Sequence, residues 1–385
     1  MARLADWLFR ALLFGAFVCI NGPSFAQSPT PPYISWEVKN RFRLFAHEAD
    51  FEHQAAAYQT ASTQTASLDN LTLYAERVLA QQSLGRGWAR GITSTCFDSA
   101  LGKLKRICQR GPDGHSENYI NPEDHFVEVH VVLPPTMTDA QCNWTVGEGR
   151  DAETFNKPCD QPLSERFRYG FATPVTVVVI QNGATQAQLN TSVQVRDILI
   201  VGMGDSIAAG EGNPDQPIAL GAADEGFCFD RPLSNGEYAV PTRAAVNVIR
   251  DCSDEQVDPI EEWEKTRAGW LLRQCHRSMY GYQFQAALAL AVENKQIAVT
   301  YVPLGCTGAT IKDGLLGRQP ARERRWYGQQ PEPKYVDGQI SQLEAYLQPQ
   351  QPGGTARKPD LIFLDRKSTR LNSSHVVTSR MPSSA

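Results

Sequence analysis

Short apolar runs and amphipathic stretches alternate along the second half of the chain. The run at 198–201 reads Ile-Leu-Ile-Val, which is typical of a strand buried on both faces of a parallel sheet. Apolar runs at 296–304 and 361–364 predict two more strands, and amphipathic stretches at 282–294 and 337–347 predict helices between them. This β-α-β-α-β order predicts an α/β domain of flavodoxin-like type, in which right-handed crossovers join parallel strands.

The beginning of the chain has a helical pattern. Residues 33–82 are expected to be mainly helical, because apolar side chains such as Phe51, Ala55 and Tyr58 recur at helical spacing. No chemistry is assigned to this region. His47 lies six residues before His53, a spacing that does not place both on one face of a helix, so they are expected to be surface or packing residues.

Between residues 91 and 195 the pattern changes to short strands separated by turn residues. The expected strands lie at 126–133, 142–146 and 175–180. The segment resembles an immunoglobulin-like or PKD-like β-sandwich, with Trp144 in its core, and is interpreted as an accessory module. His125 and His130 on this module are expected to be surface groups.

The N-terminus has the features of a secretory signal peptide. Arg3 and Arg10 precede an apolar stretch, and Ser24-Phe25-Ala26 supplies small residues for cleavage after Ala26. The apolar stretch is too short to span a bilayer as a mature helix. We therefore expect a secreted or periplasmic protein without a transmembrane segment after cleavage.

Export predicts that the cysteines form disulfides. Cys19 lies in the signal peptide, and the remaining cysteines are even in number, as expected for disulfides in an exported chain. Pairing in sequence order keeps each bridge within one region, and no spacing suggests zinc. The expected pairs are Cys96–Cys108, Cys142–Cys159, Cys228–Cys252 and Cys275–Cys306. No metal and no cofactor are expected, and the net charge of −5 gives no reason to expect nucleic acid as a partner.

Candidate chemistry follows the first strand of the α/β domain. The strand ends in Gly204-Asp205-Ser206 and is followed by Gly210. The hydroxyl of Ser206 is therefore expected at the carboxyl edge of a parallel sheet, where such sheets bind ligands. Glycine leaves the main-chain N–H groups open to a substrate carbonyl. The alternative is that Ser206 only caps the helix that follows.

These residues resemble the first block of the SGNH (GDSL-like) hydrolases. The resemblance implies that Ser206 is the acyl-accepting nucleophile and one oxyanion donor, with Gly204, Asp205 and Gly210 as supporting residues. The turn after the second strand, 305–310, resembles the second block, which implies that the N–H of Gly308 is another oxyanion donor. His276 is not assigned as the base, because the family takes its base from a later Asp-x-x-His.

The end of the chain departs from the family. Related hydrolases continue after the third strand into Gly-x-Asn-Asp, which supplies a further oxyanion donor, whereas residues 365–385 form a Ser/Thr/Arg-rich tail without apolar periodicity. The tail resembles translated adapter or vector sequence and is excluded from the interpretation of the fold. Asn372 and His375 match neither motif and receive no role. The hydrolase domain is therefore expected to be truncated and nearly inactive in this chain.

The sequence as a whole predicts an incomplete flavodoxin-like, three-layer SGNH-hydrolase domain preceded by a β-sandwich and a helical region. The expected function is hydrolysis of acyl or acetyl esters of a small molecule, lipid or glycan. Two alternatives stay open: an exported, non-catalytic binding protein that uses the β-sandwich, and an SGNH-type acyltransferase. The expected organisation is a signal peptide at 1–26, a helical region at 27–90, a β-sandwich at 91–195, a partial hydrolase domain at 196–364 and the tail at 365–385.

Overall fold

The computed structural model describes most of the chain between residues 30 and 366. The described residues are 30–64, 71–84, 87–92, 94–99, 101–110, 114–216, 268–324, 332–349 and 356–366, with the strands β13 (Phe227–Cys228) and β14 (Ile249–Arg250). The expected signal peptide, residues 367–385 of the expected tail and the Cys228–Cys252 bridge lie outside the described residues. The expected start of the tail at residue 365 is wrong, because Asp365 is the last residue of a strand that pairs with Gly204. Within the described part, no helix is long and apolar enough to cross a membrane.

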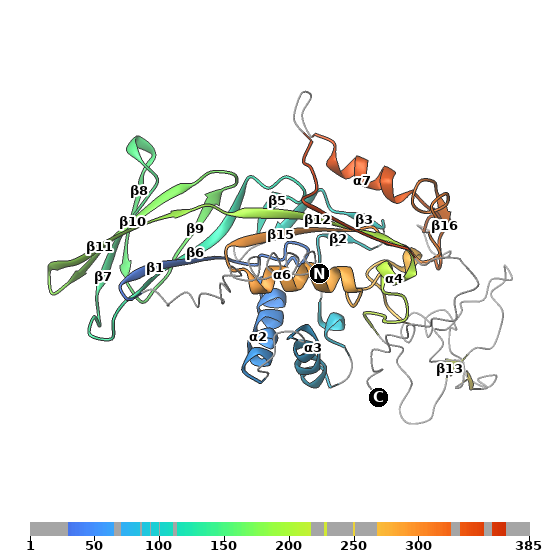
Figure 1. The fold of residues 1–385 in the computed structure, drawn as a ribbon, viewed down its shortest axis with the longest axis horizontal. Helices are drawn as coiled ribbons and strands as arrows, with labels where there is room; N and C mark the ends of the chain where they lie inside the picture. Colours follow the sequence, from blue (N-terminus) through green and yellow to red (C-terminus); the bar gives the residue numbers. More distant parts are fainter. Residues whose placement is uncertain are drawn as a thin grey trace, which may run out of the picture.

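A parallel sheet forms the centre of the molecule. Its order is β15 (Ile297–Pro303), β12 (Arg196–Gly204), β18 (Leu361–Asp365), and β12 pairs in parallel with both neighbours. α6 (Tyr282–Glu293) and α7 (Gln339–Leu347) provide the connections and lie on opposite sides of the sheet (Figure 1). The predicted β-α-β-α-β order of the second half is therefore confirmed.

Two antiparallel sheets face each other at one end of the molecule (Figure 1). One contains β1 (Tyr33–Val38), β6 (Asp124–Val132) and β9 (Leu163–Arg168), and the other contains β11 (Ala184–Val193), β10 (Thr173–Gln181), β7 (Gln141–Val146) and β8 (Glu153–Pro158). The side chain of Trp144 is buried between them, as predicted. The Cys142–Cys159 disulfide, also predicted, joins the start of β7 to the end of β8.

The N-terminal region is only partly helical, which corrects the sequence prediction. Helices α2 (Glu48–Gln64) and α3 (Leu71–Gln82) are present, but residues 33–38 form β1, which pairs with β6. The physical reason is the alternation of apolar and polar residues in Tyr-Ile-Ser-Trp-Glu-Val, which suits a strand with one face on the sandwich core.

Residues 96–119 pack with the parallel sheet, although the sequence placed them with the sandwich. Their described residues form two pairs of short antiparallel strands, and Cys96, Phe97, Cys108 and Tyr119 belong to the core cluster that contains β12 and β15. Tyr119 donates its hydroxyl to the carbonyl of Tyr301 on β15 at 2.7 Å. The pairs are β2 (Phe97–Asp98) with β3 (Lys103–Leu104) and β4 (Ile107–Arg110) with β5 (His115–Asn118), and the predicted Cys96–Cys108 disulfide is present.

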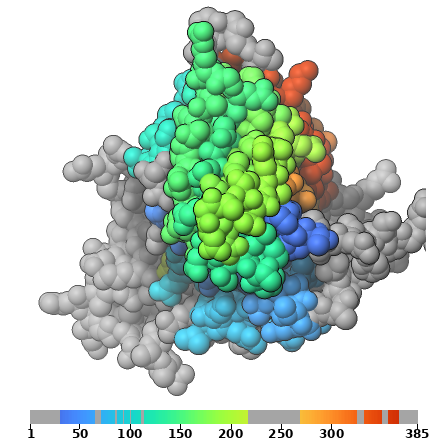
Figure 2. Space-filling model, turned by 90° about the vertical axis from the view of Figure 1, so that its left-hand side faces the viewer, coloured from blue at the N-terminus to red at the C-terminus, as the bar shows by residue number. Residues whose placement is uncertain are grey.

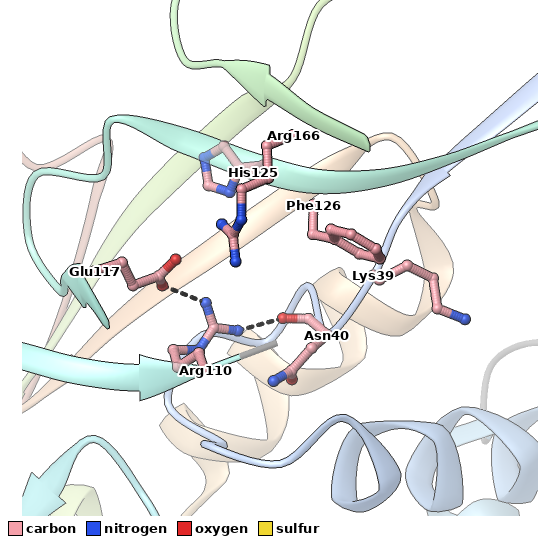
Figure 3. Close-up of a pocket in the computed structure, with 7 residues that line it drawn as sticks. All are labelled: Lys39, Asn40, Arg110, Glu117, His125, Phe126 and Arg166. Atoms are coloured by element: carbon pink, nitrogen blue, oxygen red, sulfur yellow. Dashed lines mark hydrogen bonds and ion pairs between the residues drawn. The ribbon is translucent and has the colours of Figure 1, made fainter. Parts of the chain in front are cut away.

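A buried network of charges lies where the sandwich meets the parallel sheet. Arg43, fully buried, pairs with Glu117 at 2.8 Å and with Asp197 at 3.2 Å. Burial alone would raise the pKa of Glu117, but the neighbouring Arg110 and Arg43 lower it to about 2. Figure 3 shows Arg110 reaching Glu117, with His125 above them. The network fixes the start of β12 against the hairpins and the sandwich.

His125 is buried in this network, which contradicts its expected surface position. Only 3% of the residue is exposed, and its Nε2 lies 3.3 Å from an Asp197 carboxylate oxygen. Burial lowers the pKa of His125 to about 4, so the ring is neutral near pH 7. The sequence prediction failed because alternation along β6 turns His125 inward with Val127 and Val129. His130 is partly exposed, as expected.

Candidate functional site

Ser206 lies at the start of α4 (Ser206–Ala209), directly beyond the end of β12. The residue that caps this helix is Asp205, whose carboxylate accepts the N–H of Ile207 at 3.1 Å. The capping role considered for Ser206 is therefore wrong. Ser206 is only partly buried, and its hydroxyl makes no hydrogen bond within the part of the chain that the structure describes.

The ends of the three parallel strands meet beside Ser206. The N–H of Cys306, in the turn after β15, donates to the carbonyl of Gly204 at 3.0 Å, and the N–H of Asp205 donates to the carbonyl of Asp365 at 3.2 Å. Gly204 has a φ of +137°, and a Cβ there would overlap the carbonyl of Asp365. Because of this close approach, the position requires glycine.

The turn after β15 packs directly against α4. A Cβ at Gly305 would lie 3.0 Å from main-chain atoms of Ala208 and Ala209, so the two backbones are in contact. Gly308, three residues further on, has a φ of +84° and open space where a Cβ would be. The turn containing Gly308 and the loop containing Ser206 are therefore neighbours.

Two main-chain N–H groups in this region are available to a ligand. Neither the N–H of Ser206 nor that of Gly308 donates to an acceptor among the described residues. Gly308 is exposed and Ser206 partly exposed, so solvent reaches both positions. Such N–H groups at the edge of a parallel sheet can bind a carbonyl oxygen or an anion.

The segment 275–277 holds the turn from the other side. Cys275 forms a disulfide with Cys306, as predicted, and its carbonyl accepts the N–H of Thr307 at 3.0 Å. Arg277, fully buried, donates its Nε–H to the carbonyl of Gly305 at 3.0 Å. Three consecutive residues of the turn, 305–307, are thus fixed just before Gly308.

Asp215, which follows the Ser206 loop, bonds to the two residues after this segment, Ser278 and Met279, and sequence reasoning missed it. One of its carboxylate oxygens accepts the N–H of Met279 at 2.7 Å and the hydroxyl of Ser278 at 2.9 Å. The N–H of Ser278 in turn donates to the carbonyl of Ala209 in α4 at 2.8 Å. Burial raises the pKa of Asp215 to about 7. The only sequence signal is an Asp in a polar, proline-bearing loop, which does not by itself indicate burial.

His276 is enclosed between other side chains. Its ring stacks on Trp270, with ring centroids 4.6 Å apart and an angle of 4° between the planes. Nε2 lies 3.0 Å from a carboxylate oxygen of Glu323, and Nδ1 lies 3.5 Å from one of Glu211. Both ring nitrogens therefore face carboxylates, an arrangement that gives no support to His276 as the base for Ser206.

One group of side chains has the composition of a cation site. Oxygen and nitrogen ligand atoms of Glu37, Glu128 and His130, on the paired strands β1 and β6, lie within 4.8 Å of one another. Lys295 lies 3.2 Å from Glu37, and Lys39 lies 3.6 Å from Glu128. These ammonium groups neutralise the carboxylates, so the arrangement is a partly buried ion-pair network.

Comparisons of the chain with protein-family models, with curated proteins and with solved structures found no match. The function is therefore inferred from the geometry around Ser206 and Gly308 and from the two motifs that contain them, Gly204-Asp205-Ser206 and the turn 305–310.

Proposed function

We propose that this chain belongs to a serine ester hydrolase of the SGNH type, with a flavodoxin-like catalytic domain. One observation supports the proposal: Ser206 lies at the edge of a parallel sheet, in a loop packed against the turn that carries Gly308, and neither the N–H of Ser206 nor that of Gly308 donates to an acceptor among the described residues. In the proposed site, Ser206 is the nucleophile and these two N–H groups are the oxyanion donors.

The proposed reaction is acyl transfer through Ser206. The Ser206 oxygen attacks the carbonyl carbon of an ester, and the carbonyl oxygen becomes a tetrahedral oxyanion that accepts the N–H groups of Ser206 and Gly308. One such donor contributes about 3 kcal/mol to stabilising the transition state. Collapse expels the alcohol and leaves an acyl-serine, which water hydrolyses to release the acid and restore Ser206.

The reaction also needs a base to take the proton of Ser206. His125 lies in the buried charge network and His276 between two carboxylates, so neither is assigned this role. The resemblance places the base and a further oxyanion donor after β18, where this sequence contains neither Asp-x-x-His nor Gly-x-Asn-Asp. We therefore propose very slow turnover for the 385-residue chain, since loss of the base costs about a millionfold in a serine hydrolase.

Hydrolysis of p-nitrophenyl acetate tests the proposal in two proteins. One is the 385-residue chain, and the other carries the residues that genomic DNA encodes after Leu364. We expect the second protein to hydrolyse the ester at least about a thousandfold faster, and Ser206→Ala to abolish that activity without unfolding the protein.

Two results would refute the hydrolase proposal. The first is turnover that survives Ser206→Ala, because the nucleophile would then be another group. The second is genomic DNA that encodes no base motif after Leu364, because the serine would then have no partner to activate it. Ser35→Ala, on β1 of the sandwich, is the control for a serine remote from the site.

A further inference from the structure

The outer face of the four-stranded sandwich sheet carries no charge. Residues whose side chains alternate with the buried core positions point away from the sandwich on each of its strands. They are Thr154, Asn156 and Pro158 on β8, Gln141, Asn143 and Thr145 on β7, Pro174, Thr176, Val178 and Ile180 on β10, and Thr185, Gln188, Asn190 and Ser192 on β11. We name this set the neutral face; among these described positions there is no Asp, Glu, Lys, Arg or His.

The outer face of the other sandwich sheet is different. Its outward positions include Glu37, Asp124, Glu128, Arg166 and Arg168, on three neighbouring strands; the first four are partly buried and form ion pairs, and Arg168 is exposed. Charged residues make up 21% of the chain, and they are the usual means by which a protein surface is kept soluble. The absence of charge is therefore specific to one side of the sandwich and is not a property of the whole module.

The neutral face presents ordered rows of hydrogen-bonding groups. One row crosses the sheet through Asn190, Thr176, Thr145 and Thr154, and its first two side chains are hydrogen-bonded at 2.8 Å. The next row contains Gln188, Val178, Asn143 and Asn156. Amide and hydroxyl side chains both donate and accept hydrogen bonds. Each row therefore presents hydrogen-bond donors and acceptors at the spacing of neighbouring strands. The apolar side chains of Val178 and Ile180 on β10 lie beside these polar groups.

We propose that the neutral face binds an uncharged polysaccharide. Sugar hydroxyls also donate and accept, so amide and hydroxyl rows can exchange hydrogen bonds with them, and Val178 and Ile180 can contact the C–H faces of the rings. No charged group has to lose its hydration when such a ligand covers the face, which removes the largest penalty for binding a neutral partner.

The same face is poorly suited to other partners. Nucleic acids and acidic glycans require Lys or Arg, and the central region of a protein–protein interface is enriched in aromatic residues and Arg. The neutral face has none of these residues at its described positions.

Figure 2 looks at this end of the molecule, where the strands of the sheet, green to yellow-green, lie at the front. In Figure 1 they lie at the opposite end from α4, so a bound polysaccharide would leave the Ser206 loop open.

Co-sedimentation of the full chain with insoluble cellulose, xylan, mannan and chitin tests the proposal. We expect retention on at least one of these neutral polysaccharides, and retention that is unchanged in 1 M NaCl because no ion pairs are involved. Asn143→Lys and Thr176→Lys place a charge at the centre of the neutral face and should weaken binding by at least about tenfold. Ser164→Lys, on the outer face of β9, is the matched control and should bind as the unmodified chain does.

Three outcomes would overturn the proposal. The first is no retention on any of the four polysaccharides. The second is equal weakening by Ser164→Lys, which would indicate a general effect of charge or folding and no specific face. The third is retention that salt removes, or concentration-dependent self-association that Thr176→Lys abolishes, which would identify an acidic ligand or a second copy of the chain as the partner. Circular dichroism of each variant confirms that the sandwich is folded.

Discussion

The N–H of Cys306 donates to the carbonyl of Gly204 at 3.0 Å, across the ends of two neighbouring parallel strands. This bond sets the Ser206 loop beside the turn that carries Gly308. The Cys275–Cys306 disulfide then fixes Cys306 to the segment that contacts α4 through Ser278. The position of Gly308 relative to Ser206 thus depends on a covalent link as well as on the sheet.

Removal of this disulfide is expected to affect the site beyond its effect on stability. Cys275→Ser with Cys306→Ser should lower the free energy of unfolding by about 2–5 kcal/mol and also abolish most Ser206-dependent ester hydrolysis, because the turn before Gly308 loses its link to residue 275. Urea denaturation and p-nitrophenyl acetate hydrolysis, in the protein with the genomic continuation, measure the two effects.

The Cys142–Cys159 bridge provides the control, since it joins two strands of the sandwich. Cys142→Ser with Cys159→Ser should lower stability by a similar amount and leave hydrolysis unchanged at a temperature where both variants are folded. Equal losses of activity in the two double variants would show that the turn is not specifically held by Cys275–Cys306.

Gly204→Ala is expected to be strongly destabilising. The added Cβ would overlap the carbonyl of Asp365 on β18, and alanine is also strained at a φ of +137°. Strain alone costs about 1–2 kcal/mol, so overlap with a neighbouring backbone should bring the loss above about 3 kcal/mol. Gly183→Ala, at a φ of +75° with open space around it, is the matched control and should lose only the strain energy. Similar midpoints of urea unfolding for the two variants would contradict the packing of β18 against β12.

The parallel sheet was predictable because its strands are short apolar runs, a pattern that can be recognised without knowledge of a distant partner. β12 and β15 are buried, as such runs predict, whereas Leu361, Ile362 and Leu364 of β18, at the edge of the described sheet, are exposed. β1 was missed because six alternating residues indicate a strand only once β6 is known to lie beside them.

The buried network and the details of the site could not be predicted, because their partners are far apart in sequence. Arg43 pairs with Glu117 and Asp197, which follow it by 74 and 154 residues. Likewise, Asp205 and Ser206 are both favoured at helix N-caps, so sequence alone could not decide which one caps α4.

Arg43→Met should be among the most destabilising single substitutions in the chain. It leaves the buried carboxylates of Glu117 and Asp197 with fewer positive partners, and breaking a buried ion pair from one side costs about 3–5 kcal/mol. Arg90→Met, at an exposed position, should change stability by no more than about 0.5 kcal/mol. Chemical denaturation of both variants at pH 7 measures the difference. A small loss for Arg43→Met would show that Arg110 and Arg357 are sufficient to compensate the two carboxylates.

The burial of Asp215 predicts how the free energy of unfolding depends on pH. Burial raises its folded pKa from an ordinary value near 3.8 to about 7, so between these values the folded protein holds a proton that the unfolded chain has lost. The free energy of unfolding contributed by this group therefore falls as pH rises from about 4 to about 7 and is constant above that. Asp215→Asn preserves an oxygen that can accept from Ser278 and Met279 and cannot ionise. The variant should become more stable relative to the unmodified chain as pH rises through this range.

Urea unfolding of both proteins at pH 4.5, 5.5, 6.5 and 7.5 measures this difference in stability. The opposite contribution of His125 is the same in both proteins and therefore cancels. A difference that does not change with pH would show that Asp215 ionises normally and is not enclosed beside the Ser206 loop.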